Sequence, residues 1–184
     1  LSAQRAGIGI IFQEFNLVPA MTARENIFLG QEPARLSFVP AREERRRTEE
    51  LFRRIGVRVS PNALCRDLTV AQQQVVEIAK ALLTDARIIV MDEPSAALSP
   101  RETKGLFRVI DELKSHGIGI IYISHRLDEI FEVADRVTIL RDGEHIDTRP
   151  IADLTREKMI KLMVGRSLEK EFPRRQASLG QARF

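Results

Sequence analysis

Ile88-Ile-Val-Met-Asp92-Glu93-Pro94 is the stretch of sequence that decides the fold class of this chain. Its four apolar residues form a short run rich in β-branched side chains, which predicts a buried strand. Two adjacent carboxylates, Asp92 and Glu93, follow that strand directly. The pattern therefore delivers two acidic side chains to one end of a buried strand.

Similar apolar runs on either side of this stretch predict two more strands, at residues 7–12 and 118–123. Further along the chain, residues 137–140 and 144–147 flank an Asp142-Gly143 pair, which is a hairpin turn signal. The chain is thus expected to contain a group of buried strands followed by one hairpin.

Helical patterns separate these strands. Two capping boxes, Thr22 with Glu25 and Ser99 with Glu102, predict where two of the helices begin. We expect helices at about residues 22–30, 41–55, 72–83, 100–115, 126–133 and 155–164.

Apolar strands that alternate with helices indicate an α/β fold with a mainly parallel sheet covered by helices on both faces. Ligands of such sheets bind beyond the carboxyl ends of the strands. The residues directly after each strand are therefore the candidate site residues. They are Gln13, Asp92 with Glu93, and Ser124 with His125.

The chemistry of these side chains suits phosphoryl transfer. A carboxylate such as Asp92 can hold Mg2+ directly or through water, and a second one such as Glu93 can orient and deprotonate water. Gln13 can coordinate a metal or position water, and His125 can hydrogen-bond a phosphate and a nearby carboxylate. Taken singly, each residue also fits a non-catalytic role, in which the acids simply end a strand in solvent and His125 is structural.

A fourth element begins at Leu68, 20 positions before the first residue of the 88–94 stretch. The start of the helix there offers free N–H groups to an anion, Thr69 offers a hydroxyl, and Ala71 is small enough for a phosphate to approach. The alternative is an ordinary N-cap followed by a Gln-rich surface.

Taken together, the order and spacing of these elements resemble the ATP-binding cassette (ABC) ATPases over about residues 7–165. Gln13 matches the Q-loop of that family, Ile88 to Glu93 the Walker B strand, and His125 the switch histidine. The signature motif is matched by Leu68, Thr69, Val70, Ala71 and Gln72, and the D-loop by Ser95, Ala96, Ala97 and Leu98.

This resemblance implies ATP and Mg2+ as ligands. It implies that Asp92 and Gln13 serve the metal, that Glu93 is the general base, and that Gln13 and His125 complete the catalytic set. It also implies that the signature residues bind the ATP of a second cassette. The segment through Asn16, Met21 and Phe28 is the expected docking surface for membrane subunits, unless the helical core claims Phe28.

Three stretches resemble the monosaccharide-importer branch, whose chains carry two cassettes in tandem: residues 12–19, 72–82 and 162–166. The implied partners are membrane permease subunits, a second cassette and, indirectly, a sugar-binding protein. The implied location is the cytoplasmic face of the plasma membrane. We expect residues 1–165 to be a partial ATPase domain, with a helical subdomain at about 17–84, and residues 166–184 to be a linker.

The chain departs from the family pattern at its start. No Gly-x-x-x-x-Gly-Lys-Ser/Thr loop is present, and the first residue is Leu1, so we interpret the sequence as an internal fragment that lacks the N-terminal part of the cassette. Four phosphate contacts from such a loop would contribute about 6–12 kcal/mol, at about 1.5–3 kcal/mol each, which is comparable to the whole of a micromolar affinity. The fragment is thus expected to be inactive alone, and its incomplete sheet to expose apolar surface.

Other positions depart from the pattern more mildly. Thr69 keeps the hydroxyl of the usual serine, whereas Val70 and Ala71 replace two glycines. Since a β-branched residue does not readily adopt positive φ, Val70 excludes a glycine-only conformation. Ser99 stands where the D-loop usually ends in Asp.

The composition excludes several other classes of protein. A single cysteine, Cys65, rules out an internal disulfide framework, and no apolar run is as long as a membrane span. The net charge of +3 is too small to indicate nucleic acid, and the mixed charges of residues 42–54 predict a solvated helix face. Two alternatives remain open, namely a non-transport ABC ATPase and a non-catalytic cassette that serves as an interaction module.

Overall fold

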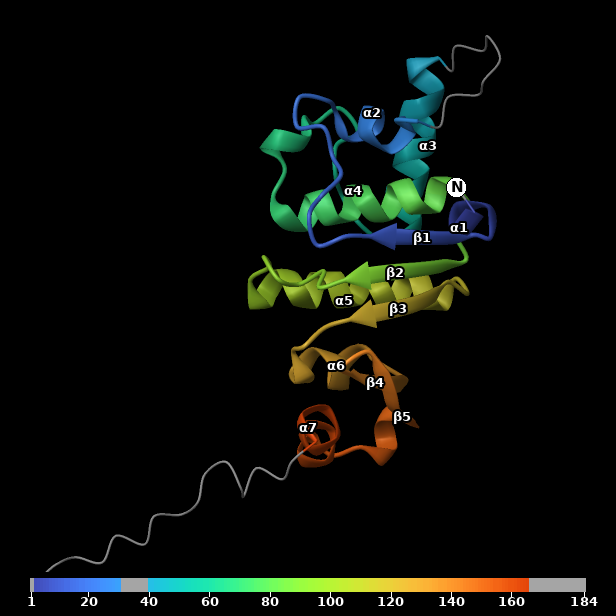
Figure 1. The fold of residues 1–184 in the computed structure, drawn as a ribbon. Helices are drawn as coiled ribbons and strands as arrows, with labels where there is room; N and C mark the ends of the chain where they lie inside the picture. The colour runs from blue at the N-terminus through green and yellow to red at the C-terminus, as the bar shows by residue number, and fades with distance from the viewer. Residues whose placement is uncertain (1, 31–39, 166–184) are drawn as a thin grey trace, which may run out of the picture. The chain divides into compact units, whose positions relative to one another are not determined.

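A computed structural model describes residues 2–30 and 40–165 of the chain (Figure 1). The chain divides into two compact units, residues 1–133 and a second unit that begins at Ala134. The elements of the first unit are α1 (Ser2–Arg5), β1 (Ile8–Ile11), α2 (Ala23–Phe28), α3 (Ala41–Arg54), η1 (Cys65–Asp67), α4 (Val70–Leu83), β2 (Ile88–Asp92), α5 (Pro100–Ser115), β3 (Gly119–Ile123) and α6 (Leu127–Val133).

The three predicted strands form one parallel sheet in the order β1-β2-β3. The register pairs Ile11 with Met91, and it pairs Asp92 with Ile123. Helices connect successive strands, as parallel pairing requires. The α/β fold class predicted from the sequence is thereby confirmed, and all three strands end at the same edge of the sheet (Figure 1).

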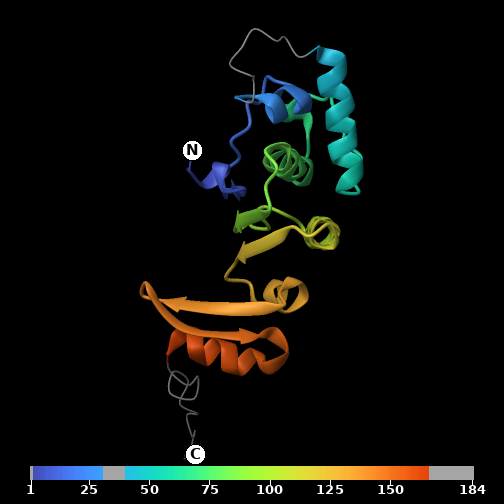
Figure 2. The ribbon, with the colours of Figure 1, turned by 90° about the vertical axis from the view of Figure 1, so that its right-hand side faces the viewer.

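One face of this sheet packs against helices α4 and α5, which lie on the same side of the strands (Figure 2). Ile11, Ile89 and Met91 point into this layer and are almost fully buried. Gly9 is buried in the same layer, where a Cβ atom at this position would lie only 2.8 Å from the Cβ of Ala81 on α4. A glycine thus allows β1 and α4 to approach closely.

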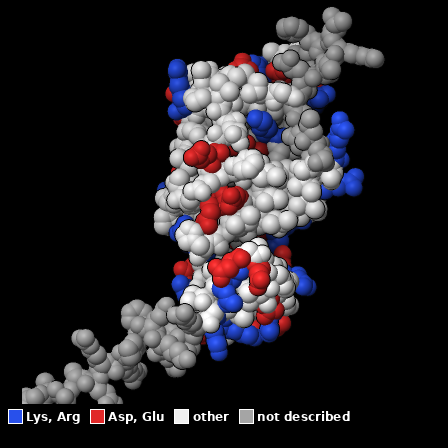
Figure 3. All heavy atoms as spheres, viewed as in Figure 1, with Lys and Arg blue, Asp and Glu red and all other residues white. Residues whose placement is uncertain are grey.

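The opposite face of the sheet is not covered by the described residues, contrary to the expectation of helices on both faces. Phe12 and Ile121 are 52% and 51% exposed, and Ile10 and Ile123 are each 46% exposed. Figure 3 shows this face as a broad area of uncharged atoms interrupted by a few charged groups. The expectation that the sheet exposes apolar surface is confirmed.

Helices α2, α3 and α4 fall between β1 and β2, within the segment expected to be helical. The predicted capping box is present, because Thr22 accepts from the Glu25 N–H while the Glu25 carboxylate accepts from the Thr22 N–H. Asn26 is fully buried behind it, and its amide lies within hydrogen-bonding distance of Val18, Met21, Thr22 and Cys65.

The charged run on α3 is a solvated surface, as predicted. Arg46 pairs with Glu43 at 2.8 Å and with Glu50 at 3.2 Å, one helical turn away on either side. The hydrogen bond from Arg46, supported by one from Arg47, lowers the pKa of Glu43 to about 2. Phe52 faces the other way and is buried in the core.

Helix α5 begins at the second predicted capping box. Ser99 accepts from the Glu102 N–H at 3.4 Å, the Glu102 carboxylate accepts from the Ser99 N–H at 2.9 Å, and Pro100 is the first helical residue. The apolar stripe of α5, which includes Leu106, Ile110 and Leu113, is buried in the core.

The second unit contains the predicted hairpin. Strands β4 (Arg136–Arg141) and β5 (Glu144–Pro150) pair antiparallel, and both turn residues, Asp142 and Gly143, have positive φ. A short turn, η2 (Ile151–Asp153), leads to helix α7 (Arg156–Val164), which packs on β4.

The expected linker at 166–184 lies outside the described residues. No helix in the described part of the chain is both long and apolar enough to cross a membrane.

Candidate active site

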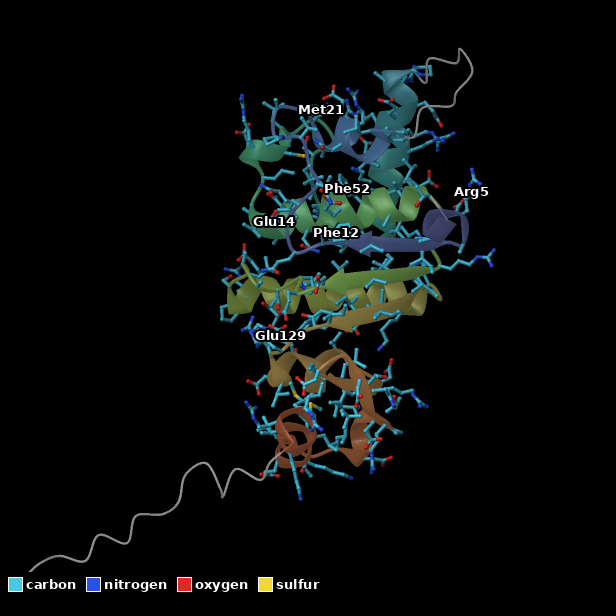
Figure 4. The ribbon with its side chains drawn as sticks, viewed as in Figure 1. Arg5, Phe12, Glu14, Met21, Phe52 and Glu129 are labelled. Carbon is cyan, nitrogen blue, oxygen red and sulfur yellow. The ribbon has the colours of Figure 1, made fainter. Side chains whose placement is uncertain are left out.

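The carboxyl ends of the three parallel strands carry the residues predicted to form the site. Gln13 comes two residues after Ile11, Glu93 two residues after Met91, and His125 two residues after Ile123. Figure 4 labels Phe12 and Glu14, which flank Gln13 at the end of β1. The sheet therefore brings the amide, the two carboxylates and the imidazole to a single edge.

Glu93 and His125 are in direct contact at this edge. Oε1 of Glu93 accepts the His125 backbone N–H at 3.2 Å and lies 2.8 Å from His125 Nδ1. The Glu93 side chain is 19% exposed, whereas the His125 side chain is 77% exposed. With Nδ1 directed at Glu93, the Nε2 atom of the imidazole is available to a ligand.

The other carboxylate oxygen of Glu93, Oε2, is buried and has no hydrogen-bond partner among the described residues. An unpaired buried carboxylate oxygen is costly, so its position calls for a ligand or water. Glu93 also has a φ of 48°, which is uncommon for a residue other than glycine and clusters at functional sites. This geometry suits a general base that activates water.

Asp92 and Gln13 reach the same edge, and no hydrogen bond or ion pair in the described part of the chain joins their side chains to this pair. Asp92 is the last residue of β2 and is half-buried, and Gln13 is exposed. No group of three or more His, Cys, Asp or Glu side chains that could hold a metal occurs in residues 2–30 and 40–165. A carboxylate with an amide nearby still fits Mg2+, since Mg2+ is often held by one or two carboxylates together with substrate phosphates.

The predicted signature residues lie at the start of α4, where they cap the helix. Thr69 accepts from the Gln72 N–H at 3.3 Å, and the Gln72 side chain accepts from the Thr69 N–H at 3.0 Å. Val70 is the first residue of the helix and has no positive φ. The ordinary N-cap and an anion site are thus compatible here, because the capping box leaves other N–H groups of the first turn without partners in the helix.

A pocket of about 370 Å³ lies beside this helix start. Ala71 and Gln72 line it together with Leu98, the last residue of the predicted D-loop. Gln74 also lines it, and its buried Nε2 atom has no partner in the described part of the chain. Two of the predicted signature residues and one of the predicted D-loop residues therefore line one pocket, which neither Glu93 nor His125 lines.

The predicted D-loop forms a tight turn after Glu93. Ala96 N–H donates to the Glu93 carbonyl at 3.0 Å, and Leu98 N–H donates to the Ser95 carbonyl at 3.0 Å. Ala96 and Ala97 are exposed, whereas Ser95 and Leu98 are buried. The turn thus presents two alanines to solvent and fixes the serine inside.

The buried Ser95 hydroxyl donates to Glu129 on α6 at 2.5 Å. Sequence reasoning missed Glu129, which is only 4% exposed. One signal was available, because Glu129 lies four residues before the buried Val133 and so falls on the inward side of α6. A carboxylate at an inward helical position indicates a polar network.

The segment after Gln13 is anchored to α4. The Asn16 N–H donates to Glu77 at 2.8 Å, and burial raises the pKa of this Glu77 carboxyl, which is 8% exposed. Of the expected docking residues, Asn16 is exposed and Met21 is half-buried, but Phe28 is only 9% exposed. Phe28 therefore belongs to the helical core, because its position on α2 points inward with Ile27.

Comparison with known proteins places this chain in a family. A family model described as ABC transporter matches residues 1–96. The ribose import ATP-binding protein RbsA 3 of Rubrobacter xylanophilus is 49% identical over 179 residues, which are 97% of this chain and 36% of that protein. A Burkholderia ambifaria protein named for ribose, galactose and methyl galactoside import is 51% identical over 96% of this chain and 34% of its own length.

Solved structures define the same class of protein, an ATP-binding cassette. The ADP conformation of MJ1267, an ATP-binding cassette of an ABC transporter, covers 90% of this chain and 71% of its own, with a TM-score of 0.73 and 26% identity. CbiO1 from Clostridium perfringens, part of an ABC transporter complex, covers 91% of this chain and 66% of its own, with a TM-score of 0.71 and 25% identity. The chain belongs to the ABC transporter family. It spans about a third of the length of the curated relatives it matches.

Proposed function

We propose that this chain is part of the ATP-hydrolysing subunit of an ABC-type importer of monosaccharides. The observation that carries the proposal is the Glu93–His125 contact at the strand edge, beside which the second, buried Glu93 oxygen has no partner among residues 2–30 and 40–165. Membership of the family and the names of the relatives, which refer to ribose, galactose and methyl galactoside import, support the substrate class.

In this proposal Glu93 is the general base. Its unpaired Oε2 takes a proton from the attacking water, while Oε1 holds the His125 imidazole in place. His125 then presents Nε2 to the γ-phosphate of ATP. Gln13, at the end of the neighbouring strand, orients the water.

Asp92 is the proposed ligand of Mg2+, with Gln13 as a second oxygen donor. Mg2+ bound together with ATP neutralises charge on the phosphates. Asp92 suits this role because it ends β2 directly beside Glu93 and is half-exposed to the strand edge.

A second cassette is the proposed partner for the start of α4. Leu68, Thr69, Val70, Ala71 and Gln72 would face the ATP held by that cassette, with the free N–H groups of the helix start directed at phosphate. The D-loop residues Ser95, Ala96, Ala97 and Leu98 adjoin this surface through Leu98.

Permease subunits of the membrane are the proposed partners for the segment that includes Asn16 and Met21. This segment follows Gln13 and is fixed to α4 through Glu77, so a movement at the nucleotide would be passed to it. The protein would then work at the cytoplasmic face of the plasma membrane, and a separate sugar-binding protein would deliver the substrate. The 184 residues alone are proposed to be inactive, because they contain no P-loop sequence.

The test uses a full-length protein that carries these residues, reconstituted with its permease in vesicles. Glu93→Gln should retain ATP binding but abolish ATP hydrolysis and the uptake of labelled ribose or galactose. Glu132→Gln, an exposed change on α6, is the matched control.

Three outcomes separate the alternatives. Hydrolysis that survives Glu93→Gln removes this residue from the base role. Hydrolysis by the unaltered protein without uptake of any of these sugars contradicts sugar import and favours a non-transport ATPase, which ribosome binding would then support. Failure of the unaltered protein to hydrolyse ATP favours the non-catalytic interaction module.

A further inference from the structure

A buried carboxylate on α6, that of Glu129, accepts hydrogen bonds from hydroxyl groups of the two segments that carry Glu93 and His125. Oε2 of Glu129, a residue labelled in Figure 4, accepts from Ser95 Oγ at 2.5 Å, from Tyr122 OH at 2.7 Å and from Ser124 Oγ at 3.4 Å. Ser95 comes two residues after Glu93. Tyr122 and Ser124 lie three residues and one residue before His125.

The remaining contacts fix this carboxylate in place. Arg126 approaches the other oxygen, Oε1, at 2.5 Å as an ion pair without directed hydrogen-bond geometry. The Arg126 N–H in turn donates to Ser124 Oγ at 3.0 Å. Tyr122 is held from behind by an edge-on contact with Phe107 of α5, with ring centroids 6.2 Å apart.

Glu129 contacts neither Glu93 nor His125 in any hydrogen bond or ion pair of the described residues, yet it holds the segments on which both are carried. The turn that contains Ser95 begins at Glu93, and the segment that contains Ser124 leads directly into His125. The 2.8 Å contact between Glu93 and His125 therefore depends on the relative position of two segments that meet at Glu129.

We propose that Glu129 is a positioning residue, which couples the turn after Glu93 to the strand end that carries His125. The inference rests on the proposed ATPase function and adds a residue to it. The hydrogen bonds from Ser95 at 2.5 Å and from Tyr122 at 2.7 Å are of the short, charge-assisted kind, one from each segment, so they transmit displacement between the two segments. A movement of the exposed alanines of the turn, Ala96 and Ala97, would thus change the Glu93–His125 geometry.

The first arm of the test measures ATPase kinetics in the full-length protein. Glu129→Gln keeps the shape but removes the charge, and it should lower kcat at least tenfold while KM for ATP stays within about twofold. Ser95→Ala removes one hydroxyl and should lower kcat several-fold, and combining the two changes should cost less than the product of their separate effects. Glu132→Gln on the same helix is the control.

The second arm does not depend on activity. Hydrogen exchange by mass spectrometry should show that Ser95→Ala speeds exchange in the turn 94–98 and also in residues 122–126, since both are held by one carboxylate. Glu132→Gln should leave both segments unchanged. Faster exchange confined to 94–98 would overturn the coupling.

The two arms separate the failure of this inference from failure of the proposed function. If the unaltered protein is active, a Glu129→Gln variant whose kcat stays within twofold contradicts the positioning role. The same holds for a variant in which KM for ATP rises by the same factor as kcat falls. An inactive unaltered protein contradicts the ATPase proposal instead, and the exchange experiment then decides the coupling alone. If Glu129→Gln does not fold, the ATPase kinetics and the hydrogen exchange are both measured in the Ser95→Ala and Tyr122→Phe variants instead.

Discussion

The Nδ1 atom of His125 lies 2.8 Å from Oε1 of Glu93, although the two residues are 32 positions apart in the sequence. The two oxygens of the Glu93 carboxylate therefore differ: Oε1 contacts the imidazole, and the buried Oε2 has no partner in the described part of the chain. The same residue bears a positive φ of 48°. An uncommon backbone conformation, together with a buried oxygen that no described residue pairs, is a combination that clusters at functional sites.

Removal of the imidazole tests this arrangement. In a full-length protein, His125→Ala should lower ATP turnover by about 100-fold or more, the usual cost of losing a group that stabilises transition-state charge, and leave nucleotide binding within a few-fold. His145→Ala, in the hairpin of the second unit, is the control. Turnover within threefold of the unaltered protein would exclude His125 from the site.

The isolated chain should bind ATP weakly. It contains no P-loop sequence, and the contacts such a loop makes to phosphates contribute about 6–12 kcal/mol at about 1.5–3 kcal/mol each. A fluorescent ATP analogue titrated into the 184 residues should show no saturable signal. Saturable binding that unlabelled ATP displaces would contradict the expectation.

The close packing of β1 on α4 gives a matched pair of glycine substitutions. Gly9→Ala places a methyl group 2.8 Å from the Cβ of Ala81, so it should lower the free energy of unfolding by about 1–3 kcal/mol. Gly105→Ala, inside helix α5, meets only the side-chain end of Arg108 at 4.0 Å and should raise the free energy of unfolding by about 0.5–1 kcal/mol. Urea unfolding of the chain measures both, and equal effects of the two changes would contradict the packing.

Asn26 should be among the most sensitive polar positions. Its amide oxygen accepts from the Val18 N–H at 2.7 Å, and its amide nitrogen lies 3.0 Å from the Val18 carbonyl and 3.1 Å from the Thr22 carbonyl. Asn26→Ala should lower the free energy of unfolding by about 3 kcal/mol, because each buried group left unpaired costs about 1–3 kcal/mol. The exposed Asn62→Ala should have little effect, and an equal loss in both variants would refute the assignment.

The buried carboxyl of Glu77 makes stability depend on pH. Because burial raises its pKa in the folded state, the folded chain keeps this proton to higher pH than the unfolded chain does. Stability is therefore lost as pH rises from 4.5, the ordinary pKa of a glutamate carboxyl, through the raised pKa of the folded state. Glu77→Gln cannot titrate but can still accept from Asn16, so its advantage over the unaltered chain should be absent below pH 4.5 and grow above it.

Urea unfolding at several pH values measures that difference. Glu132→Gln removes one negative charge from an exposed position and controls for the change in net charge. If the difference in free energy of unfolding between Glu77→Gln and the unaltered chain stays constant with pH, or shrinks as pH rises, burial does not raise the pKa of the Glu77 carboxyl.

The sequence by itself determined the five strands, the six longer helices and their order, but not α1, η1 or η2. The capping boxes of Thr22 with Glu25 and of Ser99 with Glu102, the three apolar strands and the Asp142-Gly143 turn are each found where they were predicted. These features join residues only a few positions apart, so local propensity and periodicity are enough to specify them. The parallel order of the strands also placed the candidate residues at one edge.

Only the tertiary structure decided how those residues meet. The contacts of Glu93 with His125, of Ser95 with Glu129 and of Asn16 with Glu77 span 32, 34 and 61 positions. No periodicity in the sequence encodes such pairs, since they form when strands and helices distant in the chain pack together. For the same reason the uncovered face of the sheet, with Phe12 and Ile121 half exposed, reflects which elements pack on the sheet and not the pattern of any single strand.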